Sequence, residues 1–310
     1  MVSFFSLDLY RDRQSPRLTW SGTESPEAQL MIVAISGYRG FLGSHLLAEL
    51  SKGSLSVLRV EADVRDASVW EKPFDVLVHL AAATHERFSR DPIDAFSVNV
   101  EGILRALEAC ARWDARMIFP STCGVCAPDS NGVVSEESPL APTSPYTRSK
   151  AIGESLCRAF SADFGVSCTV LRLFNVYGLS QNSAFLIPYI LERLRTGSPP
   201  TIRNPDSSRD YVNVKDVIGA IERSLCSNAP FQVLNVGSGE SVAVRQVVEM
   251  LASIVGSKPD WEGGEEPDDP IPLVRADTSR IEKALGWKPS IDLASGLKEL
   301  AHHTTDRTSA

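Results

Sequence analysis

The sequence contains no apolar run that approaches the roughly 20 residues needed to cross a membrane. It also lacks an excess of positive charge, because 31 Lys and Arg residues stand against 39 Asp and Glu residues, for a formal net charge of −8. A nucleic-acid-binding protein would need a basic face. We therefore expect neither a membrane span nor a nucleic-acid partner, although a few placed arginines can still bind one anionic ligand.

Cysteine is scarce, and six residues in a chain of 310 do not suggest a disulfide framework. The single CxxC, Cys123 to Cys126, has no second CxxC or His pair, so we expect no metal site. The apolar stretch at the N-terminus is short, is broken by Asp8 and follows no basic residues, so a secretory signal is not expected. These features favour a reducing, cytoplasmic setting.

Strands and helices are predicted to alternate from Met31 to Phe174, and 43% of the chain is apolar, which is enough for a large core. Such alternation predicts an α/β fold with a Rossmann-type, doubly wound parallel sheet. The predicted strands are 31–36, 55–60, 75–80, 116–120 and 167–174, and the predicted helices are 44–50, 92–110 and 147–164.

The pattern of predicted elements changes after Gly178, where the segments become short and are interrupted by stretches rich in Pro and Gly. We therefore predict a dinucleotide-binding domain over 31–178, with parts of 205–240 returning to its sheet. A smaller C-terminal substrate-binding lobe is expected over 179–301. Residues 1–30 and 302–310 are interpreted as tails.

A glycine-rich loop links the first predicted strand to the first predicted helix. Its glycines permit a tight turn and a close approach of the backbone to a pyrophosphate, which the helix N-terminus then stabilises. This context predicts a dinucleotide site. The loop reads Gly37-Tyr38-Arg39-Gly40-Phe41-Leu42-Gly43.

Two arginines bear on the choice of cofactor. Arg39 in the loop and Arg59 at the end of the next strand are placed to meet a 2′-phosphate on the adenosine ribose. An acidic residue binding the ribose would instead favour NAD. Asp63 is expected to face the adenine, together with Val64. The sequence therefore favours NADP(H), with NAD(H) as the alternative.

A proton-transfer pair is predicted on the helix that begins near residue 147. Tyr146 and Lys150 are one helical turn apart and project from the same face. An ammonium near a tyrosine favours the phenolate and lowers the pKa of the phenol. Thr122 directly follows a predicted strand and is placed to hydrogen-bond the reacting oxygen. The set predicts hydride chemistry on an alcohol or ketone.

The ordered motifs of the chain resemble those of extended short-chain dehydrogenases/reductases that act on nucleotide sugars, the NAD-dependent epimerase/dehydratase family. The resemblance covers Met31 to about Pro289. Its motifs are SGYRGFLG (36–43), VHLAA (78–82), NVEGILRALEAC (99–110), STCGV (121–125), SPYTRSK (144–150), LRLFNVYG (171–178), RDYVNVKDV (209–217), NVGSG (235–239) and ADTSRIEKALGWKP (276–289).

The resemblance implies a role for several further residues and a nucleotide-sugar substrate. It also implies a homodimer formed through a four-helix bundle by the helices near 95–110 and 147–164. The implied catalytic triad is Thr122, Tyr146 and Lys150; Leu80, Ala81, Ala82, Asn99, Leu173 and Phe174 line the cofactor site; Thr84 and His85 face the sugar; and Asn175 and Arg209 hold the substrate diphosphate.

The residues after Thr122 bear on the reaction. Sugar 4,6-dehydratases of this family carry Asp-Glu there, whereas this chain has Cys123-Gly124, so dehydration is disfavoured. Cys123 would lie beside the reacting carbon, where its thiol is a candidate acid or base. Two further features of the chain resemble NADPH-dependent 4-keto-sugar reductases of the GDP-fucose-synthase type. They are the glycine-rich loop and the segment before Asp75, which has one strand fewer than usual.

Three functions therefore follow from the sequence. We favour reduction of a nucleotide-linked 4-keto-6-deoxysugar at C4, with Tyr146 as the proton donor. A nucleotide-sugar 4-epimerase with tightly bound NAD is the alternative. A regulator that binds NADP(H) without catalysis is a third possibility, which the intact set of Thr122, Tyr146 and Lys150 disfavours.

Overall fold

The computed structural model describes residues 30–263 and 273–303, and the described residues from Met31 onward belong to one compact unit. The predicted N-terminal tail, apart from Leu30, and residues 304–310 lie outside the described part. The proposed boundary between a cofactor domain and a substrate lobe near residue 178 stays a prediction.

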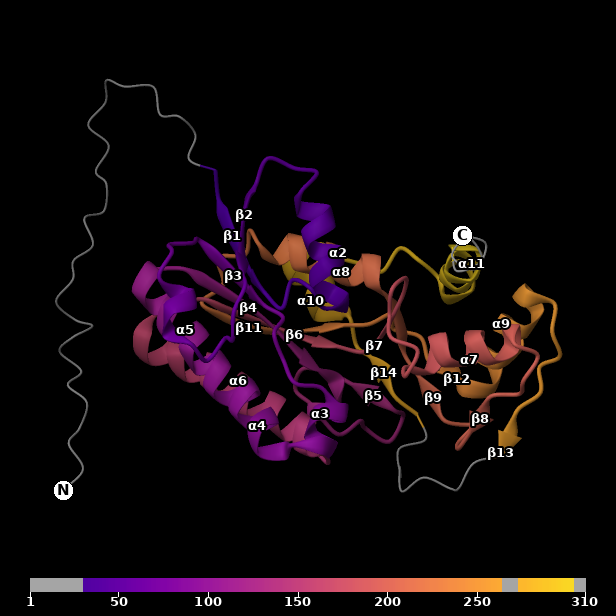
Figure 1. The fold of residues 1–310 in the computed structure, drawn as a ribbon. Coiled ribbons are helices and arrows are strands. Elements are labelled where there is room, and N and C mark those ends of the chain that lie inside the picture. Colours follow the sequence, from indigo (N-terminus) through magenta and orange to yellow (C-terminus); the bar gives the residue numbers. More distant parts are fainter. Residues whose placement is uncertain (1–29, 264–272, 304–310) are drawn as a thin grey trace. The chain divides into compact units, whose positions relative to one another are not determined.

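Six parallel strands form the main sheet of the described chain, in the order β11-β6-β4-β3-β1-β2 (Figure 1). The predicted Rossmann-type α/β fold is thereby confirmed. All residues of β3 and β6 are buried, as expected of parallel strands that are covered on both faces. The strands are β1 (Ile32–Ser36), β2 (Ser56–Val60), β3 (Val76–His79), β4 (Arg116–Thr122), β6 (Cys168–Leu173) and β11 (Phe231–Val236).

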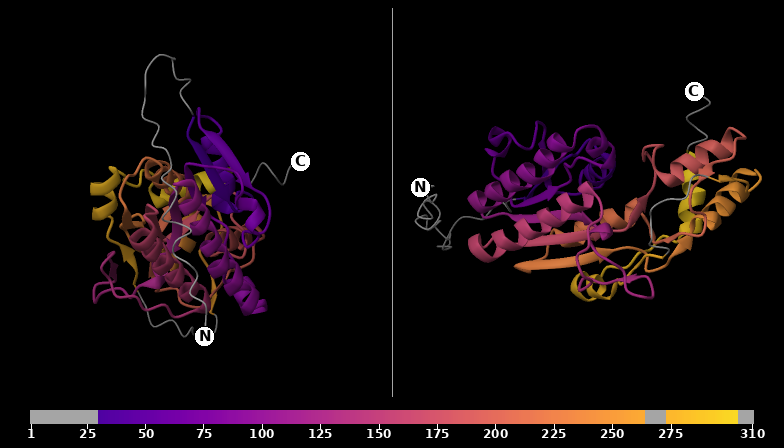
Figure 2. Two further views of the ribbon diagram at one scale, coloured as in Figure 1. Left: turned by 90° about the vertical axis from the view of Figure 1, so that its left-hand side faces the viewer. Right: turned by 90° about the horizontal axis from the view of Figure 1, so that it is seen from below.

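Helices cover both faces of this sheet and make a three-layer arrangement (Figures 1 and 2). One apolar core joins the sheet to α2, α8 and α10, and a second joins it to α5 and α6. Each fully buried Leu or Ile side chain contributes about 1.5–3 kcal/mol. The helices are α2 (Phe41–Leu50), α5 (Gly102–Trp113), α6 (Pro145–Phe164), α8 (Val214–Ser224) and α10 (Ser279–Leu285).

The sheet has a switch point at β1, which pairs with β2 on one side and with β3 on the other. The loops that leave the carboxyl ends of β1 and β3 therefore run to opposite sides, and a crevice opens between them. β2 is the only strand between Leu50 and Asp75, a stretch that the structure describes in full, and it forms the edge of the sheet. This agrees with the short segment predicted there.

The helix predicted over 92–110 is interrupted in the structure. α4 (Pro92–Phe96) passes through a π-helical turn, Ser97–Glu101, into α5. Such turns place one extra residue in the helix and are frequent at functional sites. The turn contains Asn99, and α3 (His85–Arg90) precedes it.

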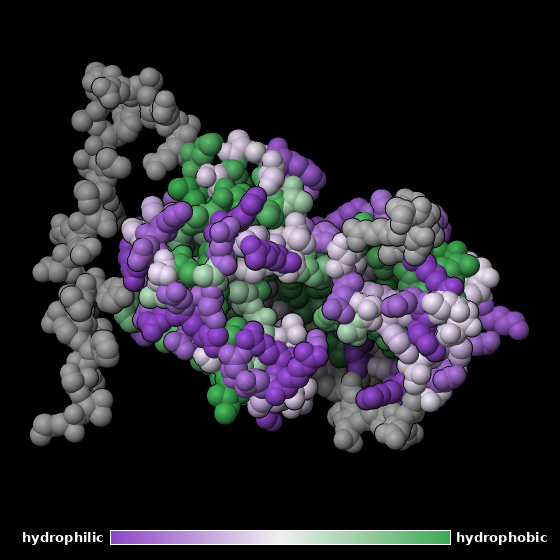
Figure 3. All heavy atoms as spheres, viewed as in Figure 1, coloured by the Kyte–Doolittle hydropathy of each residue, from purple (hydrophilic) through white to green (hydrophobic). Residues whose placement is uncertain are grey.

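A separate apolar core lies in the C-terminal part of the described chain, among α7 (Leu186–Arg195), α9 (Val244–Val255) and α11 (Leu293–His303). Hydrophobic residues line a hollow between this part and the carboxyl edge of the main sheet (Figure 3). The short strands are β5 (Val133–Val134), β7 (Asn175–Tyr177), β8 (Thr201–Ile202), β9 (Ser208–Arg209), β10 (Tyr211–Asn213), β12 (Val242–Ala243), β13 (Glu262–Gly263) and β14 (Arg275–Ala276).

Local sequence explains where α6 begins and ends. Ser144 accepts a hydrogen bond from the Thr147 N–H, while its own N–H donates to the Thr147 hydroxyl, so the two residues cap each other. Pro145 fits the first helical position. Gly165 ends the helix with a φ of +71°. Neither α6 nor any other described helix is long and apolar enough to cross a membrane.

A buried ion pair ties α6 to the sheet. Glu154 on α6 accepts hydrogen bonds from Arg172 Nε at 3.1 Å and Nη2 at 2.8 Å, and both side chains are less than one-tenth exposed. The Ser121 hydroxyl donates to the same carboxylate at 2.6 Å. Since Ser121 precedes Thr122, this pair holds the end of β4 as well as α6.

We predict that Glu154→Gln lowers the free energy of unfolding by about 3–5 kcal/mol, because it leaves the Arg172 charge buried without its counterion. Urea unfolding with a constant slope measures this change. Glu49→Gln is the control, since its partner Lys52 is exposed, and it should cost about 1 kcal/mol or less. Equal effects of the two variants would contradict the prediction.

Candidate active site

The glycine loop forms a cradle at the start of α2. Gly37 has a φ of +69°, and the Gly40 N–H donates to its carbonyl at 3.0 Å, which closes the turn. A Cβ on Gly37 would lie 2.6 Å from the Ala81 nitrogen. Among the described residues no side chain caps α2, so the first-turn N–H groups remain available to a phosphate. Phe41, Leu42 and Gly43 form that turn.

A cavity of about 270 Å³ lies beside this cradle, at the carboxyl ends of β1, β2 and β3. Its position matches the switch point, where α/β proteins of this kind bind dinucleotides. The loop, the ends of two strands and the start of α3 contribute its walls. The lining residues are Gly37, Tyr38, Arg39, Val60, Glu61, Ala62, Asp63, Val64, Ala81, Ala82, Arg87 and Val98.

Two arginines flank Tyr38 at one end of this cavity. The guanidinium carbon of Arg39 lies 5.2 Å from the centre of the Tyr38 ring, and that of Arg59 lies 6.0 Å from it. The Tyr38 hydroxyl lies 3.5 Å from a Glu61 carboxylate oxygen. The structure thus brings two cations and one carboxylate together where sequence predicted the adenosine ribose.

Asn99 joins the cofactor side of the site to α6. Its carbonyl oxygen accepts from the Ala83 N–H at 2.6 Å, and its amide donates to the Ala83 carbonyl at 3.1 Å and to the Ser149 hydroxyl at 2.9 Å. Both amide N–H groups are therefore used within the chain. Asn99 fixes the loop that contains Ala81 and Ala82, while its predicted cofactor contact stays a prediction.

Lys150 is buried beneath the end of β4. Its Nζ donates to the Pro120 carbonyl at 2.8 Å and lies 4.7 Å from the centre of the Phe119 ring. Burial lowers the pKa of Lys150 to about 8. The ammonium is thus directed at the strand end next to Thr122, with only 6% of the residue exposed.

Tyr146 is covered by aromatic rings. The ring of His85 lies 4.4 Å from it and that of Phe88 lies 6.3 Å from it, both between centroids. Burial raises the pKa of Tyr146 to about 12, and the nearby Cys123 adds to the increase. In the protein alone the pKa of Tyr146 is therefore raised by burial, and the expected lowering of this pKa by Lys150 stays a prediction.

Thr122 and Cys123 lie at the end of β4. The Thr122 hydroxyl oxygen accepts from the Gly124 N–H at 3.3 Å and caps a short 3-10 turn over Cys123–Val125. Burial raises the pKa of the Cys123 thiol to about 12, and Asp210 adds to the increase. A base role for Cys123 would require the thiolate, which this environment disfavours.

The predicted substrate residues come from three segments. Thr84 precedes α3, and His85 begins it. Asn175 donates from its backbone N–H and its amide to the Asp210 carbonyl, at 3.0 and 3.1 Å. Arg209 is the residue before Asp210, and its charge influences the pKa of Cys123. The structure therefore places Asn175 and Arg209 near Cys123, and His85 against Tyr146.

Leu173 ends β6 and Phe174 follows it, beside the end of β4, and neither residue lines the cavity. Leu173 pairs in register with Thr122, and Phe174 packs in a small core that includes Cys123. Leu80 follows β3 and donates its N–H to the Ser36 carbonyl at 3.1 Å. The sequence analysis did not predict the lining residues Ala62, Arg87 and Val98, and it gave Tyr38, Val60 and Glu61 no binding role.

Within residues 30–263 and 273–303, no group of three His, Cys, Asp or Glu side chains is arranged to hold a metal ion. All six cysteines are free, including Cys123 and Cys126. The polar groups around the cavity are instead backbone N–H groups, guanidinium groups and carboxylates. These groups suit a dinucleotide. A side chain at Gly37 or Gly43 would clash with neighbouring backbone atoms, so only glycine fits at these two positions of the loop.

Fold and site together define a dinucleotide-binding α/β protein that presents a Tyr–Lys pair on one helix. The profile of the NAD dependent epimerase/dehydratase family matches residues 33–237. The chain therefore belongs to this family and is an extended short-chain dehydrogenase/reductase, as its motifs predict. The family comprises NAD(P)-dependent nucleotide-sugar epimerases, dehydratases and reductases.

Relatives with different reactions resemble the chain to a similar degree. A putative UDP-glucose 4-epimerase of Methanocaldococcus jannaschii is 27% identical, over 87% of this chain and 97% of its own. GDP-6-deoxy-D-mannose reductase of Pseudomonas aeruginosa is 29% identical, over 86% and 94%. The crystal structure of a UDP-glucose 4-epimerase of Thermotoga maritima with UDP-glucose aligns with a TM-score of 0.84 and 25% identity, over 90% and 100%.

We predict that Gly37→Ala weakens cofactor binding by at least about tenfold, because the new methyl group would force the cradle away from Ala81. Gly256→Ala is the control, since Gly256 also has a positive φ, of +71°, but has open space around it. It should lower stability by about 1 kcal/mol and leave binding unchanged. Titration with the nucleotide measures the affinity of both variants, and urea unfolding measures their stability. Unchanged affinity in Gly37→Ala would contradict the proposed cradle.

Proposed function

We propose that the protein reduces a nucleotide-linked 4-keto-6-deoxysugar at C4 with NADPH. The observation that carries this proposal is the pair of arginines around Tyr38, which suits the 2′-phosphate of NADP(H). A cofactor that must be replaced in every turnover suits a reductase. The residues of the cradle and cavity would hold this cofactor, and it would supply the hydride.

The state of Tyr146 supports the same direction of reaction. A phenol with a pKa near 12 is protonated at neutral pH, so it can donate a proton to the C4 oxygen as the carbonyl is reduced. The hydride and this proton together complete the alcohol. An oxidation would instead require the phenol to lose its proton first.

Thr122 and Lys150 would assist that proton transfer. The Thr122 oxygen already accepts a hydrogen bond from Gly124, and its O–H, which interacts with the Cys123 side chain in the protein alone, would turn to donate to the sugar oxygen. Lys150 keeps a buried positive charge near the strand end, and this charge would stabilise the phenolate that remains. His85, Asn175 and Arg209 would bind the substrate on either side.

A 4-epimerase with tightly bound NAD is the second candidate. The Glu61 carboxylate lies in the cavity beside the Tyr38 hydroxyl, and an acid there favours the ribose hydroxyl of NAD. The epimerases of M. jannaschii and T. maritima add support. An epimerase oxidises and re-reduces one carbon and consumes no cofactor.

We also infer a homodimer formed through α5 and α6. Ile152 on α6 is 41% exposed although it is apolar, and α5 has a mainly apolar inner side and a charged outer side that includes Arg105 and Glu108.

The free cysteines support a reducing, cytoplasmic setting.

We predict that 4-keto-sugar nucleotides cause the loss of one NADPH for each alcohol formed, measured by absorbance and mass spectrometry. Tyr146→Phe should lower kcat about 10²- to 10⁴-fold, because the proton donor is lost. Tyr189→Phe is the control, since the Tyr189 hydroxyl accepts a bond from the Thr201 N–H on another part of the chain. Interconversion of sugars without loss of NADPH would favour the epimerase, and an unaffected cellular output in Tyr146→Phe would favour the regulator.

We predict that Arg39→Ala and Arg59→Ala each weaken NADPH binding by about 10- to 100-fold, because each removes a charge-assisted contact to the 2′-phosphate. NADH binding should change much less. Arg112→Ala on the exposed end of α5 is the control and should alter neither. Equal losses for NADPH and NADH would count against the NADP(H) preference.

A further inference from the structure

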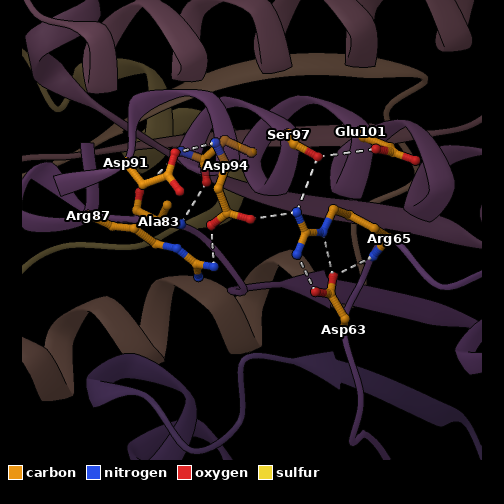
Figure 4. Close-up of polar contacts among 9 residues, drawn as sticks. Asp63, Arg65, Ala83, Arg87, Asp91, Asp94, Ser97 and Glu101 are labelled. Atoms are coloured by element: carbon orange, nitrogen blue, oxygen red, sulfur yellow. Dashed lines mark hydrogen bonds and ion pairs between the residues drawn. The ribbon is translucent and has the colours of Figure 1, made fainter. Parts of the chain in front are cut away.

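Arg65 donates three hydrogen bonds to the carboxylate of Asp63 (Figure 4). The Asp63 Oδ1 accepts from the Arg65 backbone N–H at 3.0 Å and from Nε at 2.9 Å, and Oδ2 accepts from Nη2 at 2.5 Å. Asp63 lines the cavity, whereas Arg65 does not belong to its lining. Arg65 therefore acts on the cavity through its bonding partners and not by lining it.

The guanidinium of Arg65 is itself anchored to a helix. Nη1 donates to Asp94 on α4 at 2.8 Å and to the Ser97 hydroxyl in the π-helical turn at 3.2 Å. Asp94 also pairs with Arg87, which lines the cavity. The chain of alternating charges thus connects the loop after β2 to α3 and α4 and restrains the Arg65 side chain (Figure 4).

The hydrogen bonds from Arg65 determine what the Asp63 carboxylate can still bind. A carboxylate has about four acceptor positions, two on each oxygen. Among the described residues Arg65 occupies both positions on Oδ1 and one on Oδ2, so one position on Oδ2 is left. Bonding to Arg65 lowers the pKa of Asp63 to about 2, so at neutral pH the group is ionised and can only accept.

We propose that Arg65 is a positioning residue that leaves Asp63 one acceptor for the exocyclic amino group of the cofactor's adenine, and that it thereby selects adenine over a 6-oxopurine. The inference rests on the proposed dinucleotide site. A 6-amino group donates to the remaining position of Oδ2. A 6-oxo group presents an acceptor to a carboxylate, and the two would repel each other.

The test compares NADPH with its hypoxanthine analogue, in which the 6-amino group is replaced by oxygen. Dissociation constants are measured by titration of the full chain without sugar, so the result does not depend on which reaction is catalysed. The wild-type protein should prefer NADPH by about 10- to 100-fold, the value of one hydrogen bond to a charged group.

Arg65→Gln should reduce this preference severalfold, toward one, because it removes both guanidinium bonds and leaves only the bond from the backbone N–H of residue 65 to Oδ1. Arg65→Lys keeps the charge but not the fork that holds both oxygens, so its preference should fall between the two; it replaces Arg65→Gln if that variant does not fold. Arg90→Gln is the matched control, because Arg90 on α3 is exposed and pairs with Glu86. It should keep the wild-type preference.

Loss of packing alone would weaken both nucleotides equally and leave their ratio unchanged. A wild-type preference near one, or an unchanged preference in both Arg65 variants, would overturn the inference while the dinucleotide site stands. If the wild-type protein bound neither nucleotide, the proposed function would fail as well.

Discussion

The attachment of α6 to the carboxyl edge of the sheet is the constraint on which the proposed site depends. Tyr146 lies in the first turn of this helix, so its position relative to Thr122 follows from that attachment. Breaking one such buried hydrogen bond costs about 1–3 kcal/mol, and the contacts reach two strands and the π-helical turn that contains Asn99. They are Lys150 to Pro120, Ser121 and Arg172 to Glu154, and Asn99 to Ser149.

Burial then sets the chemistry of the groups that α6 presents. The same removal of water raises the pKa of Tyr146 and lowers that of Lys150, because both charged forms lose solvation. The phenol therefore keeps its proton until a developing alkoxide takes it. Aromatic cover from α3 is the main difference from a solvated tyrosine, and α3 is also the helix that the ionic chain from Arg65 reaches.

Much of the fold was predictable because parallel strands leave buried apolar runs between glycine and helix signals. β1, β3 and β6 fall within a few residues of their predicted bounds. The site was predictable where a motif is contiguous, as in the glycine loop. It was not predictable where contacts join distant segments: Arg65 to Asp94, and His85 on Tyr146, depend on how α3 and α4 pack, and the pKa of Tyr146 depends on that packing.

The central claim is that hydride leaves the cofactor for the sugar while Tyr146 supplies the proton. NADPH labelled with deuterium at C4 of the nicotinamide tests it most directly, with a 4-keto-6-deoxysugar nucleotide as substrate. The account predicts one deuterium at C4 of the product sugar for each NADP⁺ formed, and a rate of labelled product formation that falls about 10²- to 10⁴-fold with Tyr146→Phe. An interconverted sugar that carries no deuterium, with the labelled NADPH unchanged, would contradict it.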